Sequence, residues 1–167
     1  GFMLLVSHLG EMDPGITPRM PVLNSPLLSI HVSIIMVSYA LLSLTFVCAV
    51  AYFCTRRSTK ANIVQINSQL TTLSQIFLYP AITTLGLGIF IGAIWANISW
   101  GNYWGWDPKE TWALITFMIY AIPLHSYSLP QFRKPDKYHL FMFLAFLSIL
   151  MTYFGVNYIL GGMHSYA

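Results

Sequence analysis

Charged residues are scarce in this sequence. Of its 167 residues, 8% are charged and 56% are hydrophobic, whereas a soluble domain carries roughly 25% charged residues. Eight basic and five acidic side chains are too few to coat the surface of a water-soluble protein of this size. A surface that faces lipid needs no charge. The composition therefore excludes an ordinary soluble domain and predicts an integral membrane protein.

Cysteine is also scarce, and a signal peptide is not recognisable. The two cysteines, Cys48 and Cys54, are not spaced as CxxC and lie in an apolar run. We therefore interpret both as small buried residues rather than as a redox pair. The chain opens at Gly1 without the charged start and cleavage pattern of a signal peptide. Its apolar first residues resemble the end of a helix, which favours the C-terminal part of a longer protein.

Long apolar runs predict an all-α fold. A membrane-spanning helix needs about 20 mostly apolar residues. Four segments reach that length: residues 26–53, 76–95, 108–129 and 138–160. We expect a single membrane domain, residues 1–167, built as a polytopic transmembrane helix bundle with four full spans and the end of a truncated first helix. The more polar residues 61–74 are expected to form an amphipathic helix along the membrane interface.

Capping signals mark the ends of these helices. Asn24-Ser25-Pro26 offers a capping side chain followed by proline at the first helical position. Asp107-Pro108 repeats this pattern, and Glu110 is placed to complete a capping box. We therefore assign Asp107 and Glu110 a structural role. The pair Gly161-Gly162 suits the end of the last helix.

Basic residues predict how the spans are oriented. Lys and Arg are enriched in cytoplasmic loops close to the ends of spans. Six of the eight basic residues lie in two connections, after the first span and before the fourth: Arg56, Arg57, Lys60, Arg133, Lys134 and Lys137. These connections are expected to be cytoplasmic. The loop between the second and third spans and the C-terminus then lie on the opposite face. The net charge of +3 thus reflects topology, and no nucleic-acid partner is expected.

All five tryptophans lie between residues 95 and 112, in and beside that outer loop. An aromatic belt at the membrane interface would explain Trp95 and Trp112, which flank the spans. It explains the loop itself poorly, where three tryptophans are interspersed with two glycines: Trp100, Gly101, Trp104, Gly105 and Trp106. Glycine lets the backbone turn sharply or approach a ligand closely, and flat rings suit a large, flat, apolar ligand. The loop therefore favours a ligand platform over a simple belt.

The segment Trp-Gly-Asn-Tyr-Trp-Gly-Trp-Asp-Pro-Lys-Glu-Thr-Trp, residues 100–112, resembles the tryptophan-rich WWD signature of the haem-handling family that contains CcsA, CcmC and CcmF. Its ending is most similar to the CcsA (ResC-type) branch. The similarity runs from about Met12 to Ala167 and includes residues 24–32 and 164–167. The resemblance implies haem b (iron protoporphyrin IX) as the cofactor. It also implies two protein partners, apocytochrome c and a CcsB (ResB-type) subunit or fused domain.

Two histidines belong to the same face as the tryptophan loop. His31 lies about five residues into the first span, and an ionisable residue inside a span marks function by default. His164 follows the last span, and sequence alone leaves it open as an ordinary surface residue. Two imidazoles from different helices could ligate haem iron from both sides. The resemblance implies that His31 and His164 are the two external haem ligands.

A third histidine, His125, lies near the inner end of the third expected span. It is about 17 residues past Pro108, hence roughly 25 Å deeper, so it cannot share an iron with the outer histidines. The resemblance implies that it ligates a second haem near the cytoplasm, with a partner ligand from elsewhere. The sequence departs from the family here, because the basic residue expected beside His125 is missing. His139 is expected to be solvated at the inner interface, and neither it nor His8 is assigned as a ligand.

The resemblance implies haem export and attachment in system II cytochrome c maturation. The protein would carry haem to the outer face and present it to the CxxCH motif of apocytochrome c, within a holocytochrome c synthase complex. No residue of this chain is assigned as catalytic. Arg19 and Lys109 are candidates for binding the haem propionates, or are ordinary interface charges. The expected location is a bacterial inner membrane or a thylakoid-type membrane.

Two alternatives to this function stay open. One is a haem chaperone of the CcmC type, which delivers haem without making a thioether bond. The other is a membrane transporter subunit that binds no haem and whose tryptophans form only a belt. An assay for the thioether product separates the first alternative, and an absorption spectrum of the purified protein separates the second.

Overall fold

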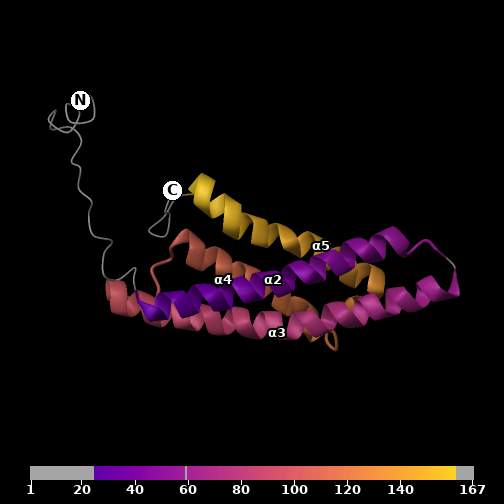
Figure 1. Cartoon of the computed structure of the whole chain (residues 1–167), viewed down its shortest axis with the longest axis horizontal. Coiled ribbons are helices and arrows are strands. Elements are labelled where there is room, and N and C mark those ends of the chain that lie inside the picture. Colours follow the sequence, from indigo (N-terminus) through magenta and orange to yellow (C-terminus); the bar gives the residue numbers. More distant parts are fainter. Residues whose placement is uncertain (1–24, 59, 161–167) are drawn as a thin grey trace, which may run out of the picture.

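The computed structural model describes residues 25–58 and 60–160, and these form helices with no strand among them. In chain order the elements are α2 (Pro26–Thr55), α3 (Ala61–Trp100), α4 (Pro108–Ala121), the 3₁₀ helices η2 (Ile122–His125) and η3 (Pro130–Arg133), α5 (Pro135–Leu150) and the π-helical η4 (Met151–Leu160). The long helices run up and down along one common direction (Figure 1). The all-α fold is therefore confirmed, whereas the truncated first helix lies outside the described residues.

Within the described residues, three helices are long and apolar enough to cross a membrane: Pro26–Thr55, Ala61–Trp100 and Pro135–Tyr158. They confirm three of the four expected spans. The third expected span, residues 108–129, is wrong in its extent, because α4 ends after 14 residues. Pro123 has no amide hydrogen to continue the α-helical pattern, and the chain passes into η2. At ~1.5 Å per α-helical and ~2.0 Å per 3₁₀ residue, α4 and η2 together rise roughly 30 Å.

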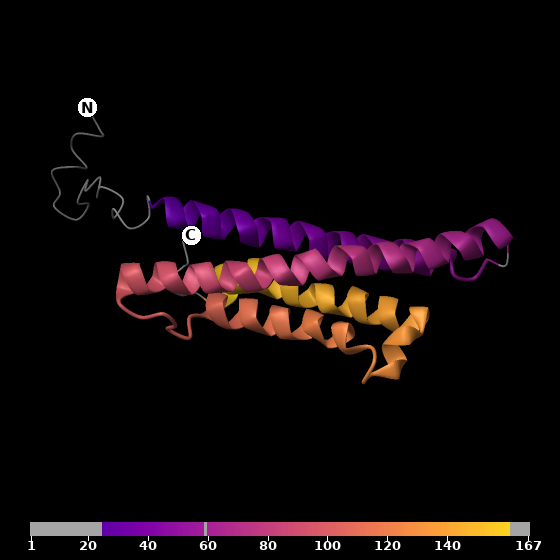
Figure 2. The same cartoon turned by 90° about the horizontal axis from the view of Figure 1, so that it is seen from below.

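Residues 61–74 do not form a separate helix along the membrane surface, so that expectation was wrong. They are the first turns of α3, a continuous helix of 40 residues. The segment contains no glycine or proline that would break it. Figure 2 shows that the hairpin of α2 and α3 extends beyond the ends of α4 and α5. At ~1.5 Å per residue α3 is about 60 Å long, twice the thickness of a bilayer's hydrocarbon core.

Polar side chains at the start of α3 bond to the neighbouring helix α5. Thr71 Oγ1 lies 3.0 Å from His139 Nε2, and Ser74 Oγ lies 3.2 Å from the Tyr138 hydroxyl. The ring of Tyr52 stacks on His139 with the centroids 4.3 Å apart. His139 is completely buried, so the expectation that it is solvated was wrong. Thr71 and Ser74 thus make contacts inside the bundle, whereas most other polar side chains of residues 61–74 are exposed.

The packing of α2 against α3 is antiparallel and close. Ser38 Oγ donates a hydrogen bond to the Ala81 carbonyl oxygen at 2.9 Å, and both residues are buried. The surrounding core joins α2, α3, α4 and α5, and its fully or nearly buried members include Leu42, Leu78, Leu85, Tyr120 and Met142. Ser25 Oγ accepts from the Leu28 amide at 3.2 Å and so begins α2 as predicted. Cys48 is buried as expected, whereas Cys54 is exposed, because it lies on the outer side of α2.

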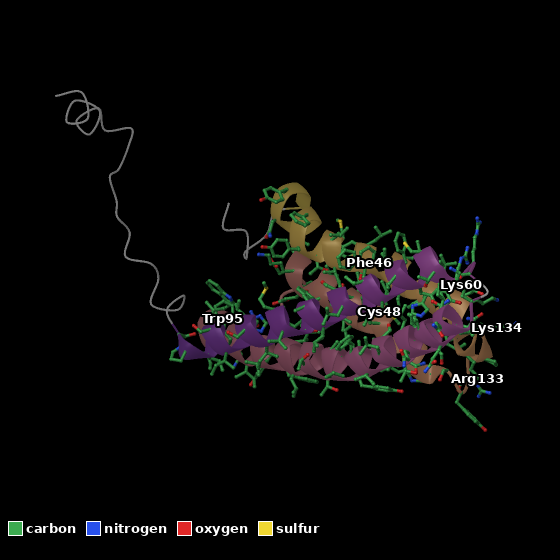
Figure 3. The ribbon with its side chains drawn as sticks, turned by 45° about the vertical axis from the view of Figure 1, so that its right-hand side comes forward. Phe46, Cys48, Lys60, Trp95, Arg133 and Lys134 are labelled. Atoms are coloured by element: carbon green, nitrogen blue, oxygen red, sulfur yellow. The ribbon has the colours of Figure 1, made fainter. Side chains whose placement is uncertain are left out.

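The two ends of the bundle differ in composition. Figure 3 places Lys60, Arg133 and Lys134 together at one end and Trp95 at the other. At the basic end Arg56 forms an ion pair of 3.2 Å with Asp136, which joins the end of α2 to the start of α5. The prediction that the basic connections share one side of the bundle is thus confirmed as an arrangement in space.

We predict that Thr71→Val destabilises the protein. The other ring nitrogen of His139, Nδ1, is buried and has no hydrogen-bond partner among the described residues. Removing the Thr71 hydroxyl would leave Nε2 unsatisfied as well, at a cost of about 1–3 kcal/mol. Thermal unfolding in detergent measures the loss. Thr72→Val is the matched control, because its hydroxyl is exposed and bonds to Ser68 in its own helix. Equal melting temperatures for the two variants would contradict the prediction.

Candidate functional site

A cavity of about 240 Å³ lies at the tryptophan end of the bundle. Side chains from α2, α3, α4, η4 and the loop between α3 and α4 line it, among them His31, Tyr39, Trp95, Trp104 and Lys109. The structure therefore brings His31 and part of the tryptophan loop into one place, as the sequence predicted. His31 and Tyr39 are eight residues apart on α2, so the cavity extends roughly 12 Å along that helix.

His31 is fixed in the second turn of α2 by a contact with α3. Its Nδ1 lies 2.8 Å from the Gly88 carbonyl oxygen. A carbonyl oxygen only accepts hydrogen bonds, so Nδ1 carries the proton and donates. Gly92 provides the space for the ring, because a Cβ at that position would lie 2.6 Å from His31 Cε1. Nε2 is then the nitrogen that would coordinate a metal.

Four of the five tryptophans form an inner and an outer pair. Trp95 and Trp104 line the cavity, and Trp95 is only 2% exposed. Trp100 packs edge-on against Trp95 with the ring centroids 6.1 Å apart, and Trp106 packs against Trp104 in the same way at 5.9 Å. Trp106 itself is 73% exposed. The outer pair thus supports the inner pair, and the inner pair contacts the cavity.

Sequence reasoning missed Trp95, which it assigned to an aromatic belt. The structure buries this residue because it faces the bundle. Gly88, Gly92 and Trp95 are spaced four and three residues apart, which puts them on one face of a helix. That spacing was the available signal. Trp112, the other residue assigned to the belt, is half-buried near the start of α4.

Glu110 holds the tryptophan loop in shape. Its Oε2 accepts from the Gly105 amide at 2.9 Å and from the Asp107 amide at 3.3 Å. Asp107 in turn caps α4 by accepting from the Lys109 amide at 3.1 Å, which completes the predicted capping box. The two amides bound by Glu110 flank Trp106, whose φ of 57° is the only positive value among the described non-glycine residues. Glu110 therefore stabilises a backbone conformation that L-residues rarely adopt.

The two loop glycines have different roles. Gly101 ends α3 in the left-handed conformation, with φ of 76°, which is the common glycine stop of a helix. A Cβ at this position would meet no atom within 4 Å. Gly105 contributes its amide to Glu110. These glycines were expected to allow either a sharp turn or a close approach of the backbone to a ligand. The sharp turn is confirmed for Gly101.

Hydroxyl groups form the deep end of the cavity. Tyr39 and Thr152 both line it. Thr152 Oγ1 also lies 3.1 Å from Thr116 Oγ1 and 2.7 Å from the Ser148 carbonyl oxygen. Nothing in the sequence pattern indicated the hydrogen bond between Thr116 and Thr152, which joins α4 and the π-helical η4.

The remaining predicted site residues lie elsewhere. His125 is exposed in η2, where its Nδ1 lies 3.0 Å from the Ala121 carbonyl oxygen. α4 and η2 separate it from the cavity, as expected. His164, His8 and Arg19 lie outside the described residues.

The sequence profile of a family described as cytochrome C assembly protein matches residues 1–164. The chain belongs to this cytochrome c assembly family. It is 43% identical to Protein NrfI of Wolinella succinogenes, over 100% of this chain and 19% of that protein. It is 37% identical to Cytochrome c biogenesis protein CcsA of Chlamydomonas reinhardtii, over 90% of this chain and 43% of that protein. The corresponding CcsA of Solanum tuberosum is 40% identical, over 70% and 36%.

These relatives confirm the resemblance to CcsA and associate the family's membrane helices with cytochrome c biogenesis. The chain spans less than half the length of each of them. The cavity, with one anchored histidine and two tryptophans, is therefore part of a member of the cytochrome c assembly family.

We predict that Glu110→Ala loosens the loop. It removes one half of the capping box and the acceptor for two amides, so it should cost about 0.5–2 kcal/mol. Thermal unfolding and tryptophan fluorescence of the haem-free protein measure the change, with the fluorescence expected to shift to the red. Glu110→Gln is the matched control, because its carbonyl oxygen can still accept both bonds. The assignment fails if the alanine variant keeps the melting temperature and fluorescence of the glutamine variant.

Proposed function

We propose that the cavity binds haem and presents it for covalent attachment to apocytochrome c. The observation that carries this proposal is that one cavity is lined by His31, Trp95, Trp104 and Lys109. An imidazole can ligate haem iron. Indole rings suit the flat apolar macrocycle, and an ammonium group can pair with a propionate. The iron, the macrocycle and a propionate of haem thus each have a suitable partner in one place.

His164 is proposed as the second axial ligand. Three residues of η4 line the cavity, namely Thr152, Tyr153 and Asn157. η4 ends at Leu160, and His164 follows four residues later in the sequence. The helix η4, which precedes His164 in the sequence, thus borders the cavity, and this supports pairing His164 with His31.

The orientation of the bundle follows from its basic end. Arg56, Lys60 and Lys134 belong to the end opposite Trp95, and such residues favour the cytoplasm. The cavity and the tryptophan loop would then face the non-cytoplasmic side. That is the side on which apocytochrome c would meet a bound haem.

In the proposed reaction haem supplies the iron and two vinyl groups, and apocytochrome c supplies two thiols. Each thiol adds across a vinyl double bond. A carbon–sulfur bond forms, the hydrogen passes to the other vinyl carbon, and no net oxidation occurs. The cysteines of this chain, Cys48 and Cys54, are in the half of α2 that leads to Arg56, so the chain places no described thiol at the cavity. Its part is to bind, ligate and orient the substrate.

His125 is proposed to ligate haem on the cytoplasmic side before transfer to the cavity. It is exposed, and its Nδ1 contact with Ala121 leaves Nε2 as the coordinating nitrogen. The second ligand would come from a CcsB-type partner or from a further part of the protein. Haem loading at one end and attachment at the other would make this chain a haem-transporting component of a holocytochrome c synthase.

We predict that His31→Ala and His164→Ala each lower haem retention and holocytochrome formation at least about ten-fold, because an axial ligand is lost. Added imidazole should partly restore both, since it can fill the open coordination position. Absorption spectra, haem content and covalently bound haem in the cytochrome are the measurements. Ser33→Ala is a control on the same helix, because its exposed hydroxyl bonds to Ser29 in α2. Normal spectra and haem content in both histidine variants would refute the ligand assignment.

The thioether assay also separates the alternatives. Haem binding without thioether formation in the complete complex would favour a haem chaperone. A wild-type protein that neither contains nor takes up haem would favour a membrane subunit with no haem function.

We predict that His125→Ala lowers total haem without damaging the outer cavity. The variant would lack supply from the cytoplasmic side, and haem added from the non-cytoplasmic side should still fill the cavity and give the wild-type spectrum. Haem stoichiometry of the folded, monodisperse protein is the readout. Full occupancy of His125→Ala without added haem would remove His125 from the proposed path.

A further inference from the structure

We propose that one turn of α3, from Gly88 to Gly92, is a positioning element that sets the orientation and basicity of the His31 imidazole. This inference rests on the proposed function, because it concerns the use of His31 as a haem ligand. Two independent contacts carry it. One is steric and involves the missing side chain of Gly92, and the other is a hydrogen bond to the carbonyl group of Gly88.

The His31 imidazole lies so close to Gly92 that no side chain can be accommodated at position 92. A Cβ built on Gly92 would lie 2.6 Å from His31 Cε1, 2.8 Å from Nδ1 and 3.3 Å from Nε2. The first two distances are shorter than side chains in proteins tolerate, and a rigid aromatic ring cannot bend aside as an aliphatic chain can. The ring of His31 therefore rests directly on the backbone of α3. Alanine at position 92 would push it away.

The hydrogen bond to Gly88 determines which ring nitrogen of His31 would coordinate the haem iron. In a regular α-helix the Gly88 carbonyl accepts from the amide of residue 92, and its second lone pair accepts from His31 Nδ1 at 2.8 Å. Donation from Nδ1 fixes the tautomer and makes the imidazole a stronger electron donor through Nε2. Because the bond comes from another helix, it also couples the position of the ring to the packing of α2 against α3.

A general packing role for these glycines is the competing explanation. Small residues four apart allow membrane helices to approach closely. The two glycines have different neighbours, however. A Cβ at Gly88 would meet the flexible end of Ile35 at 2.5 Å, whereas one at Gly92 would meet the imidazole of His31. A third glycine on the same helix, Gly86, faces only the Phe117 ring at 3.2 Å. The packing and positioning roles can therefore be separated by substitution.

The first experiment is a double-mutant cycle on haem-free protein purified in detergent, using thermal unfolding. We expect Gly92→Ala to lower the melting temperature by about 4 °C or more, because overpacking strains the ring and its hydrogen bond. In the His31→Ala background the same substitution should cost less than half as much, because the clashing ring is absent. An equal loss in both backgrounds overturns the inference, since it would mean that Gly92 serves helix packing alone.

The second experiment records absorption spectra and reduction potentials with bound haem. We expect Gly92→Ala to shift the haem from six-coordinate low-spin toward five-coordinate high-spin, to raise its reduction potential, and to recover the low-spin spectrum with added imidazole. Gly86→Ala, the matched control, should keep the wild-type spectrum and potential. A wild-type spectrum and potential for Gly92→Ala would overturn the inference.

The two experiments separate this inference from the proposed function. A wild-type protein that takes up no haem overturns the proposed function, and with it the ligand role of the turn, whatever the cycle shows. A protein with haem ligated by His31 but with no coupling between positions 31 and 92 overturns the positioning inference alone.

Discussion

Close antiparallel packing of α2 against α3 is the interaction on which the rest of the structure depends. In lipid no hydrophobic force drives two apolar helices together, so small residues and interhelical hydrogen bonds do so. Both occur along this contact. His31 and Ser38 of α2 each reach a carbonyl oxygen of α3, at Gly88 and Ala81 respectively. The two pairs are seven residues apart on each helix, so they fix one register and thereby place His31 beside the tryptophan loop.

The two ends of the α2–α3 pair differ in the side chains that surround them. At the basic end, polar groups of α3 and α5 bond to each other, as Thr71 does to His139. At the other end the chain turns at Gly101, and Glu110 stabilises the returning loop by binding two of its amides. The result is a cavity in which α3 holds His31 in place, and the carboxylate of Glu110 holds the loop that carries Trp104. Both supports lie behind the side chains that would touch a haem.

Sequence reasoning predicted the features that depend on local chemistry. The caps at Ser25 and Asp107 and the separation of His31 from His125 follow from residue types and helix rise, and the structure has them. The predictions were wrong for features that depend on which side chains pack against each other in the fold. Helices that are apolar on every side do not reveal which face is buried, so Trp95 was assigned to an aromatic belt at the membrane interface and His139 to water. The extents of α3 and α4 were also predicted wrongly. The polar residues 61–74 continue α3, and the chain passes from α4 into η2 next to Pro123.

The absorption spectrum of the protein purified from membranes shows whether the cavity beside His31 binds haem. We expect a six-coordinate low-spin haem spectrum, together with a pyridine haemochrome spectrum of haem b after extraction. Colourless protein that remains colourless and shows no change in tryptophan fluorescence when haem is added would contradict it. Trp95 and Trp104 line the cavity, so their emission would be quenched by a haem bound there.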